Sequence, residues 1–262
     1  MTRPFLFLCI LLLTGLMGHG QQTASNDIME QGEELSPIYQ SRKNLVKFNF
    51  TGLLLKNYQF KAERVLNKTF SLGLSYGFMP EGGIPWLDNI ESLVDDEELM
   101  NTLGDAMVSY SAITPEVRIY LGKGYGKGFY LAPFYRHSKY EFGNVSIEFE
   151  ADGLGARDLA MNGELKGNSF GLLLGTQFNL GNRLVLDWWI LGPHYGGSEG
   201  RLVGRSAQPL SQAEQDSLRE ELESLDIPLV DTAYQVDENG ATMEIDGPWA
   251  GIRAGFSLGL RF

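Results

Sequence analysis

Cysteine and histidine are scarce in this chain of 262 residues. The single cysteine, Cys9, lies in an apolar run near the start, and no small residue precedes it as a lipoprotein acylation site requires. Neither a disulfide framework nor a thiolate metal site is therefore expected. His137 and His194 do not have a recognisable zinc spacing, so we expect neither a metal site nor a cofactor.

Basic charge is also scarce, because 33 Asp and Glu residues outnumber 21 Lys and Arg residues and give a formal net charge of −12. Nucleic-acid binding depends on clustered basic side chains and is therefore disfavoured. Beyond the first residues, the chain has no apolar stretch long enough for a transmembrane helix. An exported chain without such a helix can still span a membrane, but only as a closed barrel.

The N-terminus has the pattern of a secretory signal peptide. Arg3 precedes an apolar run from Phe5 to Leu13, and Gly18 to Gly20 form a small-residue exit. The alternative, a retained membrane anchor, needs a longer apolar core. We therefore predict a signal peptide over residues 1–20, a flexible periplasmic leader over 21–43 and a folded domain over 44–262.

The folded part is dominated by alternation of large apolar residues with small or polar ones, which is typical of β-strands. The 32 glycines and the 11% aromatic content also favour short strands and tight turns over helices. Clear alternation covers residues 70–78, 113–121, 169–180 and 250–262, and weaker alternation covers 46–54, 58–66, 129–142 and 183–195. The sequence thus predicts eight strands.

Three features favour a membrane barrel over a soluble exported β-sandwich. Many predicted strands reach the nine to eleven residues or so that cross a tilted bilayer. Short connections, such as 67–68, 122–127 and 181–182, alternate with long ones at 80–111, 150–162 and 198–246. The chain also ends on Phe262, in an alternating strand of the kind that the barrel assembly machinery recognises. We predict an all-β, eight-stranded antiparallel up-and-down transmembrane β-barrel, in contact with outer-membrane lipid and with both termini in the periplasm.

Two of the long loops carry helical patterns. Ser211 and Glu214 have the spacing of a capping box, and Leu218, Leu222 and Leu225 follow at helical spacing. A weaker pattern covers residues 91–103. We therefore expect short helices in the long outer loops.

Charged residues of both signs occupy the polar faces of the predicted strands. They are Lys47, Lys61, Glu63, Glu116, Arg118, Arg136, Asp187 and Arg253. The interior of an eight-stranded barrel is only wide enough for side chains to fill, and buried charges must be paired. We interpret these residues as a plug of ion pairs that closes the lumen; the alternative is a proton or ion path.

One group of residues invites a catalytic reading. His137, Ser138 and nearby Glu141 are the residue types that lipid A deacylases of the outer membrane use. Neighbouring residues of a strand point to opposite faces, so His137 and Ser138 should diverge. The segment Gly122 to Gly126 lacks the ending of a phosphate-binding loop, which favours a turn.

The long connections are acidic. Residues 80–111 contain eight Asp or Glu residues and no Lys or Arg, and Glu220, Glu221, Glu223 and Asp226 lie on or next to the second predicted helix. The simplest interpretation is a solvated surface; a surface that binds divalent cations or a basic partner is the alternative. These features favour a non-enzymatic barrel with a structural or display role, and a lipid-modifying barrel enzyme is the second hypothesis.

Several short motifs resemble those of a known protein family. They are Asn44 to Asn49, Leu53-Leu54 with Tyr58, Glu63 to Leu66, Tyr76 to Pro80 and Tyr130 to His137. Across residues 44–262 the chain resembles a family of outer-membrane barrels of unknown function, common in Bacteroidetes-type bacteria. The resemblance implies an OmpA-like or OmpX-like barrel and brings no catalytic residues.

Overall fold

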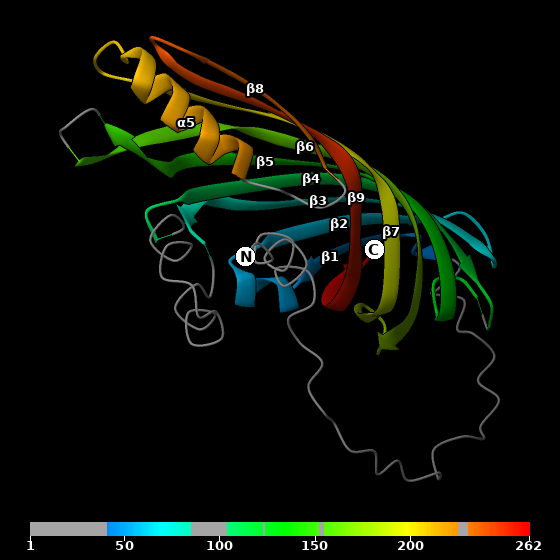
Figure 1. Cartoon of the computed structure of the whole chain (residues 1–262). Helices are drawn as coiled ribbons and strands as arrows, with labels where there is room; N and C mark the ends of the chain where they lie inside the picture. Colours follow the sequence, from blue (N-terminus) through cyan, green and yellow to red (C-terminus); the bar gives the residue numbers. More distant parts are fainter. Residues whose placement is uncertain (1–40, 85–103, 123, 152–154, 225–229) are drawn as a thin grey trace, which may run out of the picture.

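The computed structural model describes residues 41–84, 104–122, 124–151, 155–224 and 230–262 (Figure 1). The predicted signal peptide, most of the predicted leader and the predicted helix over 91–103 lie outside these residues. No helix within the described ranges is long and apolar enough to cross a membrane.

The domain is a single antiparallel sheet of nine strands. The strands are β1 (Asn44–Asn49), β2 (Tyr58–Val65), β3 (Phe70–Gly83), β4 (Met107–Tyr120), β5 (Gly128–Ala151), β6 (Gly155–Leu180), β7 (Leu184–Arg205), β8 (Asp231–Asp237) and β9 (Gly240–Arg261). A 3-10 helix, η1 (Thr51–Leu55), follows β1, and an α-helix, α5 (Gln212–Ser224), lies between β7 and β8.

The sheet closes into a ring because β1 pairs with β9 as well as with β2. The later part of β9 lies between β7 and β1, with Leu45 opposite Arg261. Its first residues, 240–246, lie between β7 and β8 instead. Among the described strands β8 pairs only with β9, so it extends the wall beyond the closed part of the ring.

The strand count and the loop lengths differ from the sequence-based prediction. The sheet has nine strands rather than eight, because β8 forms within a segment that was predicted to be loop. The segments 150–162 and 198–246 were also predicted as loops, but they contribute to β5, β6, β7 and β9. β5 has 24 residues and β6 has 26, so both continue well past the length that a bilayer requires.

At β1 the strand is shorter than predicted. After Asn49 the chain enters η1, and the backbone N–H of Gly52 donates to Asn49 Oδ1 at 3.2 Å. The Thr51 hydroxyl accepts a 2.8 Å hydrogen bond from the backbone N–H of Phe256. The hydrogen bond from Phe256 attaches the connection between β1 and β2 to β9, next to the β1–β9 pairing that closes the ring.

The two faces of the ring are opposite in character to those of a soluble barrel. Exposed side chains on the outer face are large and apolar, and they include Val46, Phe60, Leu72, Leu74, Tyr76, Ile113, Val117, Phe170, Leu172, Leu174, Trp188, Leu191, Tyr195, Ile252, Phe256, Leu258 and Leu260. Buried side chains inside the ring include Lys47, Lys61, Glu63, Glu116, Arg118, Gln177, Asp187 and Arg253. The apolar faces read from the sequence thus point outward.

The predicted capping box is present at the start of α5. The backbone N–H of Glu214 donates to Ser211 Oγ at 3.2 Å, and the backbone N–H of Ser211 donates to Glu214 Oε2 at 2.8 Å. Together with an ion pair to Arg157 at 2.6 Å, these bonds hold the pKa of Glu214 below its ordinary value. Figure 1 shows α5 against the extended end of the sheet, next to β5 and β8.

A separate apolar core holds α5 in place. Leu218 and Leu222 are fully buried and pack against side chains of the extended strands: Phe149, Leu159, Met161, Ala241 and Met243. This cluster explains why β5, β6 and β9 continue beyond the ring, because α5 and these strands bury each other's apolar faces.

Candidate functional site

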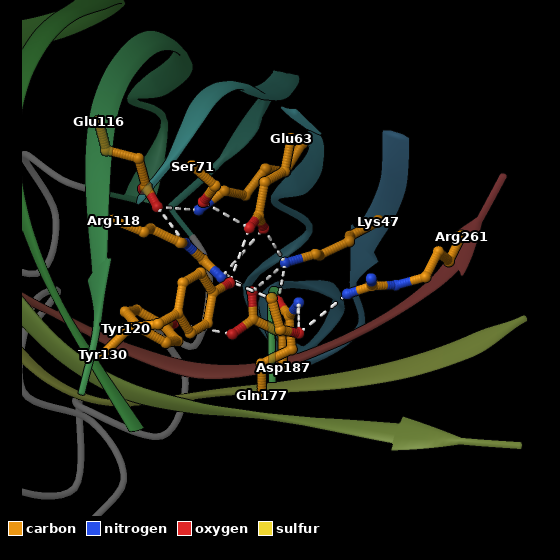
Figure 2. Close-up of polar contacts among 12 residues, drawn as sticks. Lys47, Glu63, Ser71, Glu116, Arg118, Tyr120, Tyr130, Gln177, Asp187 and Arg261 are labelled. Carbon is orange, nitrogen blue, oxygen red and sulfur yellow. Dashed lines mark hydrogen bonds and ion pairs between the residues drawn. The ribbon is translucent and has the colours of Figure 1, made fainter. Parts of the chain in front are cut away.

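A network of charged side chains fills the narrow interior of the ring (Figure 2). Of the eight residues predicted to face the lumen, Lys47, Lys61, Glu63, Glu116, Arg118, Asp187 and Arg253 are buried there, and Arg136 is partly buried. Alternation explains their direction, since successive residues of a strand point to opposite faces. Sequence separations of up to 140 residues show that ring closure, and not local structure, brings them together.

Arg118 on β4 lies at the centre of the network. Its Nε lies 2.6 Å from Glu116 Oε1, and its Nη2 lies 2.7 Å from Asp187 Oδ2. Its Nη1 lies 3.2 Å from Glu63 Oε2 and donates a 3.0 Å hydrogen bond to Gln177. The guanidinium also lies 4.0 Å from the ring centre of Tyr130. One arginine therefore contacts three carboxylates from three different strands.

Two lysines complete the ion pairs. Lys47 Nζ on β1 lies 2.5 Å from Glu63 Oε2 and 2.8 Å from Asp187 Oδ2, and it donates to Gln177. Lys61 on β2 pairs with Glu116 on β4. Because all these side chains are shielded from water, each carboxylate depends on the cations for its stabilisation.

Neutral side chains that were not predicted for the network satisfy the remaining carboxylate oxygens. Tyr120 and Ser71 each donate a 2.7 Å hydrogen bond to Glu63 Oε1. Tyr130 donates one of 2.7 Å to Asp187 Oδ1. Strand alternation already places Ser71 and Tyr120 on the polar face, but a search restricted to charged residues misses them. With these residues, every strand of the closed ring contributes at least one side chain.

The short turn between β4 and β5 closes one end of the network. Arg261 donates to the carbonyl oxygens of Tyr125 at 2.9 Å and Gly126 at 3.0 Å, and Gln177 Nε2 also donates to Gly126 at 2.7 Å. A Cβ at Gly126 would lie 2.5 Å from Arg261 Nη2, so a side chain there would displace the guanidinium. The glycine-rich segment is thus a turn whose carbonyls bind this arginine.

The two remaining arginines lie at the edge of the network. Arg253 Nη1 is 3.7 Å from Glu116 Oε2, and its guanidinium lies 4.6 Å from the ring centre of Phe134 and 4.8 Å from that of Trp189. Arg136 hydrogen-bonds to Tyr110 and, at 3.2 Å, to Thr114. No carboxylate of the described residues lies within 4.0 Å of Arg136. The structure therefore places Arg136 outside the ion-pair network to which it was assigned.

The candidate catalytic residues do not converge. His137 lies on the outer face, where its Nδ1 is 2.8 Å from Asn168 Oδ1, whereas Ser138 is buried inside and donates to the carbonyl of Gly167 at 3.3 Å. Glu141 accepts a 2.7 Å hydrogen bond from Lys139. Within the described ranges, no group of three or more His, Cys, Asp or Glu residues is arranged to hold a metal ion.

Comparison with known proteins gives fold-level similarities alone. No protein-family model and no curated protein sequence matches this chain. Its structure is similar to the crystal structure of CarO2 from Acinetobacter baumannii, at 13% identity and a TM-score of 0.32, covering 79% of this chain and 98% of that one. It is also similar to the outer membrane protease OmpT from Escherichia coli, at 9% identity and a TM-score of 0.29, covering 84% and 93%. At these values no residue role is transferred from either protein.

Proposed function

We propose that this protein is a non-enzymatic outer-membrane barrel that is closed by its charge network and presents its long acidic strand ends on the cell exterior. The observation that carries the proposal is the inverted distribution of side chains. Phe170 and Tyr195 are 71% and 67% exposed on the outer face, whereas Arg118 and Asp187 are 0% exposed inside. Water disfavours so large an apolar surface, but the hydrocarbon core of a bilayer accommodates it.

Charge at the two ends of the barrel supports an orientation. The end with the short turns carries Arg42, Lys43, Arg64, Lys68, Lys127 and Arg183, and the segments 41–45, 64–72, 124–131, 179–186 and 258–262 contain no Asp or Glu. Short turns face the periplasm in bacterial barrels. Lysine and arginine at that end would contact the anionic headgroups of the periplasmic leaflet.

The opposite end is acidic and extends far beyond the apolar band. Its exposed carboxylates include Glu81, Glu148, Asp158, Glu199, Glu220, Glu223, Asp231, Asp237, Glu238, Glu244 and Asp246. Lys139, Glu141, Glu164 and Lys166 form an exposed set of ion pairs on β5 and β6. Because this end is polar and α5 packs on it through a buried apolar core, a binding role at the cell surface fits the structure better than a role in the membrane interior.

The first test concerns location. We expect the mature protein in the outer-membrane fraction, and we expect the unheated protein to migrate differently from the heated protein on a denaturing gel, because a closed strand ring resists detergent unfolding. Replacing outward-facing Leu74 and Leu172 with lysine puts charge into the hydrocarbon region and should strongly reduce membrane recovery. Replacing exposed Glu220 and Glu223 with lysine serves as the control. Recovery of the wild type in the soluble periplasmic fraction would contradict the proposal.

A second test concerns catalysis. Since His137 and Ser138 lie on opposite faces of β5, we expect cells with and without the protein to give the same lipid A mass spectrum. Ser138→Ala should leave that spectrum unchanged. Loss of an acyl chain from lipid A in cells with the wild type, but not in cells with the Ser138→Ala variant, would establish a deacylase activity and refute the non-enzymatic role.

A further inference from the structure

Beyond the charge network, several buried nitrogen atoms at and around Arg253 have no hydrogen-bond partner among the described residues. They are both terminal nitrogens of Arg253, Nε1 of Trp189 and Nδ1 of His194. The three residues are 6%, 2% and 7% exposed. In folded proteins nearly all buried polar atoms have a partner, so several unpartnered atoms in one place indicate that something binds there.

The contacts of Arg253 show that these atoms belong to one cluster. Its guanidinium lies against the rings of Phe134 and Trp189, at 4.6 Å and 4.8 Å. The imidazole of His194 meets Phe134 edge-on at 6.0 Å between ring centres. Arg136 follows Phe134 by two residues on β5, so both side chains lie on the same inward face of that strand. The cluster is therefore lined by two arginines and two ring nitrogens, with Phe134 between them.

Among the described residues, the charges inside the ring do not balance. Six cations, Lys47, Lys61, Arg118, Arg136, Arg253 and Arg261, face three carboxylates, Glu63, Glu116 and Asp187. The carboxylate nearest to Arg253, Glu116, already binds Lys61 and Arg118 through its Oε1. Arg261 is bound by the carbonyl oxygens of Tyr125 and Gly126. The described cations that have neither such carbonyl partners nor a carboxylate within hydrogen-bond distance are therefore Arg136 and Arg253. An uncompensated buried charge is strongly unfavourable, so this surplus among the described residues favours the binding of an anion.

We propose that the barrel interior binds a small oxyanion, such as phosphate or a carboxylate, at Arg253 and Arg136. A guanidinium pairs two oxygens at once in its own plane, which favours an oxyanion over a halide. Trp189 Nε1 donates to a third acceptor position, and His194 Nδ1 donates in the tautomer that carries its proton there. This binding site lies on the side of the network away from the turn that binds Arg261, so the anion is held without a path through the barrel.

The test uses the full-length mature protein in a phosphate-free sugar detergent, with inorganic phosphate as the probe. Titration followed by ³¹P NMR should show saturable broadening of the phosphate resonance. Arg253→Gln should raise the dissociation constant for phosphate about tenfold or more, because a charged hydrogen-bonding partner is lost. Arg205→Gln, which removes an exposed arginine at the end of β7, is the matched control and should bind like the wild type.

Three results would overturn the proposal. One is the absence of saturable binding by the wild type, a measurement that does not depend on any variant folding. A second is equal displacement of phosphate by chloride and by acetate at the same ionic strength, since that would mark nonspecific screening. The third is wild-type affinity in heat-modifiable Arg253→Gln protein. If Arg253→Gln does not fold, Arg136→Gln provides the same comparison, and unchanged affinity in that variant overturns the proposal as well.

Discussion

Replacing Arg118 with methionine should lower the free energy of unfolding of the barrel by about 3–5 kcal/mol. Methionine keeps most of the side-chain volume, so the loss reports on charge and not on a cavity. Without Arg118, the carboxylates of Glu63, Glu116 and Asp187 keep only Lys47 and Lys61 as close cations, with Arg253 at 3.7 Å from Glu116. The measurement is urea unfolding in lipid vesicles, followed by tryptophan fluorescence and by heat modifiability.

Two comparisons separate the network from general effects of substitution. Arg205→Met changes an exposed arginine at the end of β7 and should cost no more than about 0.5 kcal/mol. Combining Arg118→Met with Asp187→Leu removes a cation and a carboxylate together, and its cost should be smaller than the sum of the single costs. Equal losses for Arg118→Met and Arg205→Met would show that the buried network does not stabilise the ring.

The wild-type barrel should show no large, steady conductance in planar bilayers. Side chains from every strand of the closed ring meet in the network, and Arg261 with the β4–β5 turn closes one end of it. A barrel of this width filled by its own side chains has no room for a water column. Steady wild-type conductance of porin size would refute the plug and favour a transport role.

Removing charged side chains from the network should make the barrel conduct ions. Replacing Lys47, Arg118 and Asp187 with serine removes three buried charged side chains at its centre and should produce a measurable ion leak. A control that replaces Arg201, Arg205 and Glu199 with serine changes the same number of each charge on exposed parts of β7 and should stay closed. Both variants are first checked for heat modifiability, so that a leak is read only from folded barrels.

The alternation of residues predicted the faces of the strands well, because side-chain direction in a strand depends only on parity. Residues 250–262 have their large apolar side chains outside and Arg253, Ser257 and Arg261 inside, as the pattern indicates. The pattern fails where the register shifts. Between Trp189 and Gly192 an irregularity in β7 changes the parity, so the outward residues after Trp188 are Leu191 and Tyr195.

Strand length was harder to predict from the sequence. The segments 150–162 and 198–246 are polar and rich in turn-forming residues, and these features favour loops. Their strands are stabilised instead by partners distant in sequence. Asn162 of β6 lies opposite Val203 of β7 in the sheet, and Arg157 forms an ion pair with Glu214 on α5. Such pairings form only once the sheet is assembled, and single-sequence periodicity contains no information about them.

By itself the sequence determined which residues face the interior, where the capping box starts α5, and that the apolar and polar faces belong to strands. These are local properties, set by backbone geometry within a few residues. Only the tertiary structure decided the height at which each inward residue lies and therefore which charges meet. Lys47 reaches Asp187 across the ring, whereas Arg136 lies too far along β5 to join a carboxylate of the described network. That outcome depends on the stagger between strands and on the β1–β9 pairing that closes the ring, and both follow from contacts between segments distant in the chain.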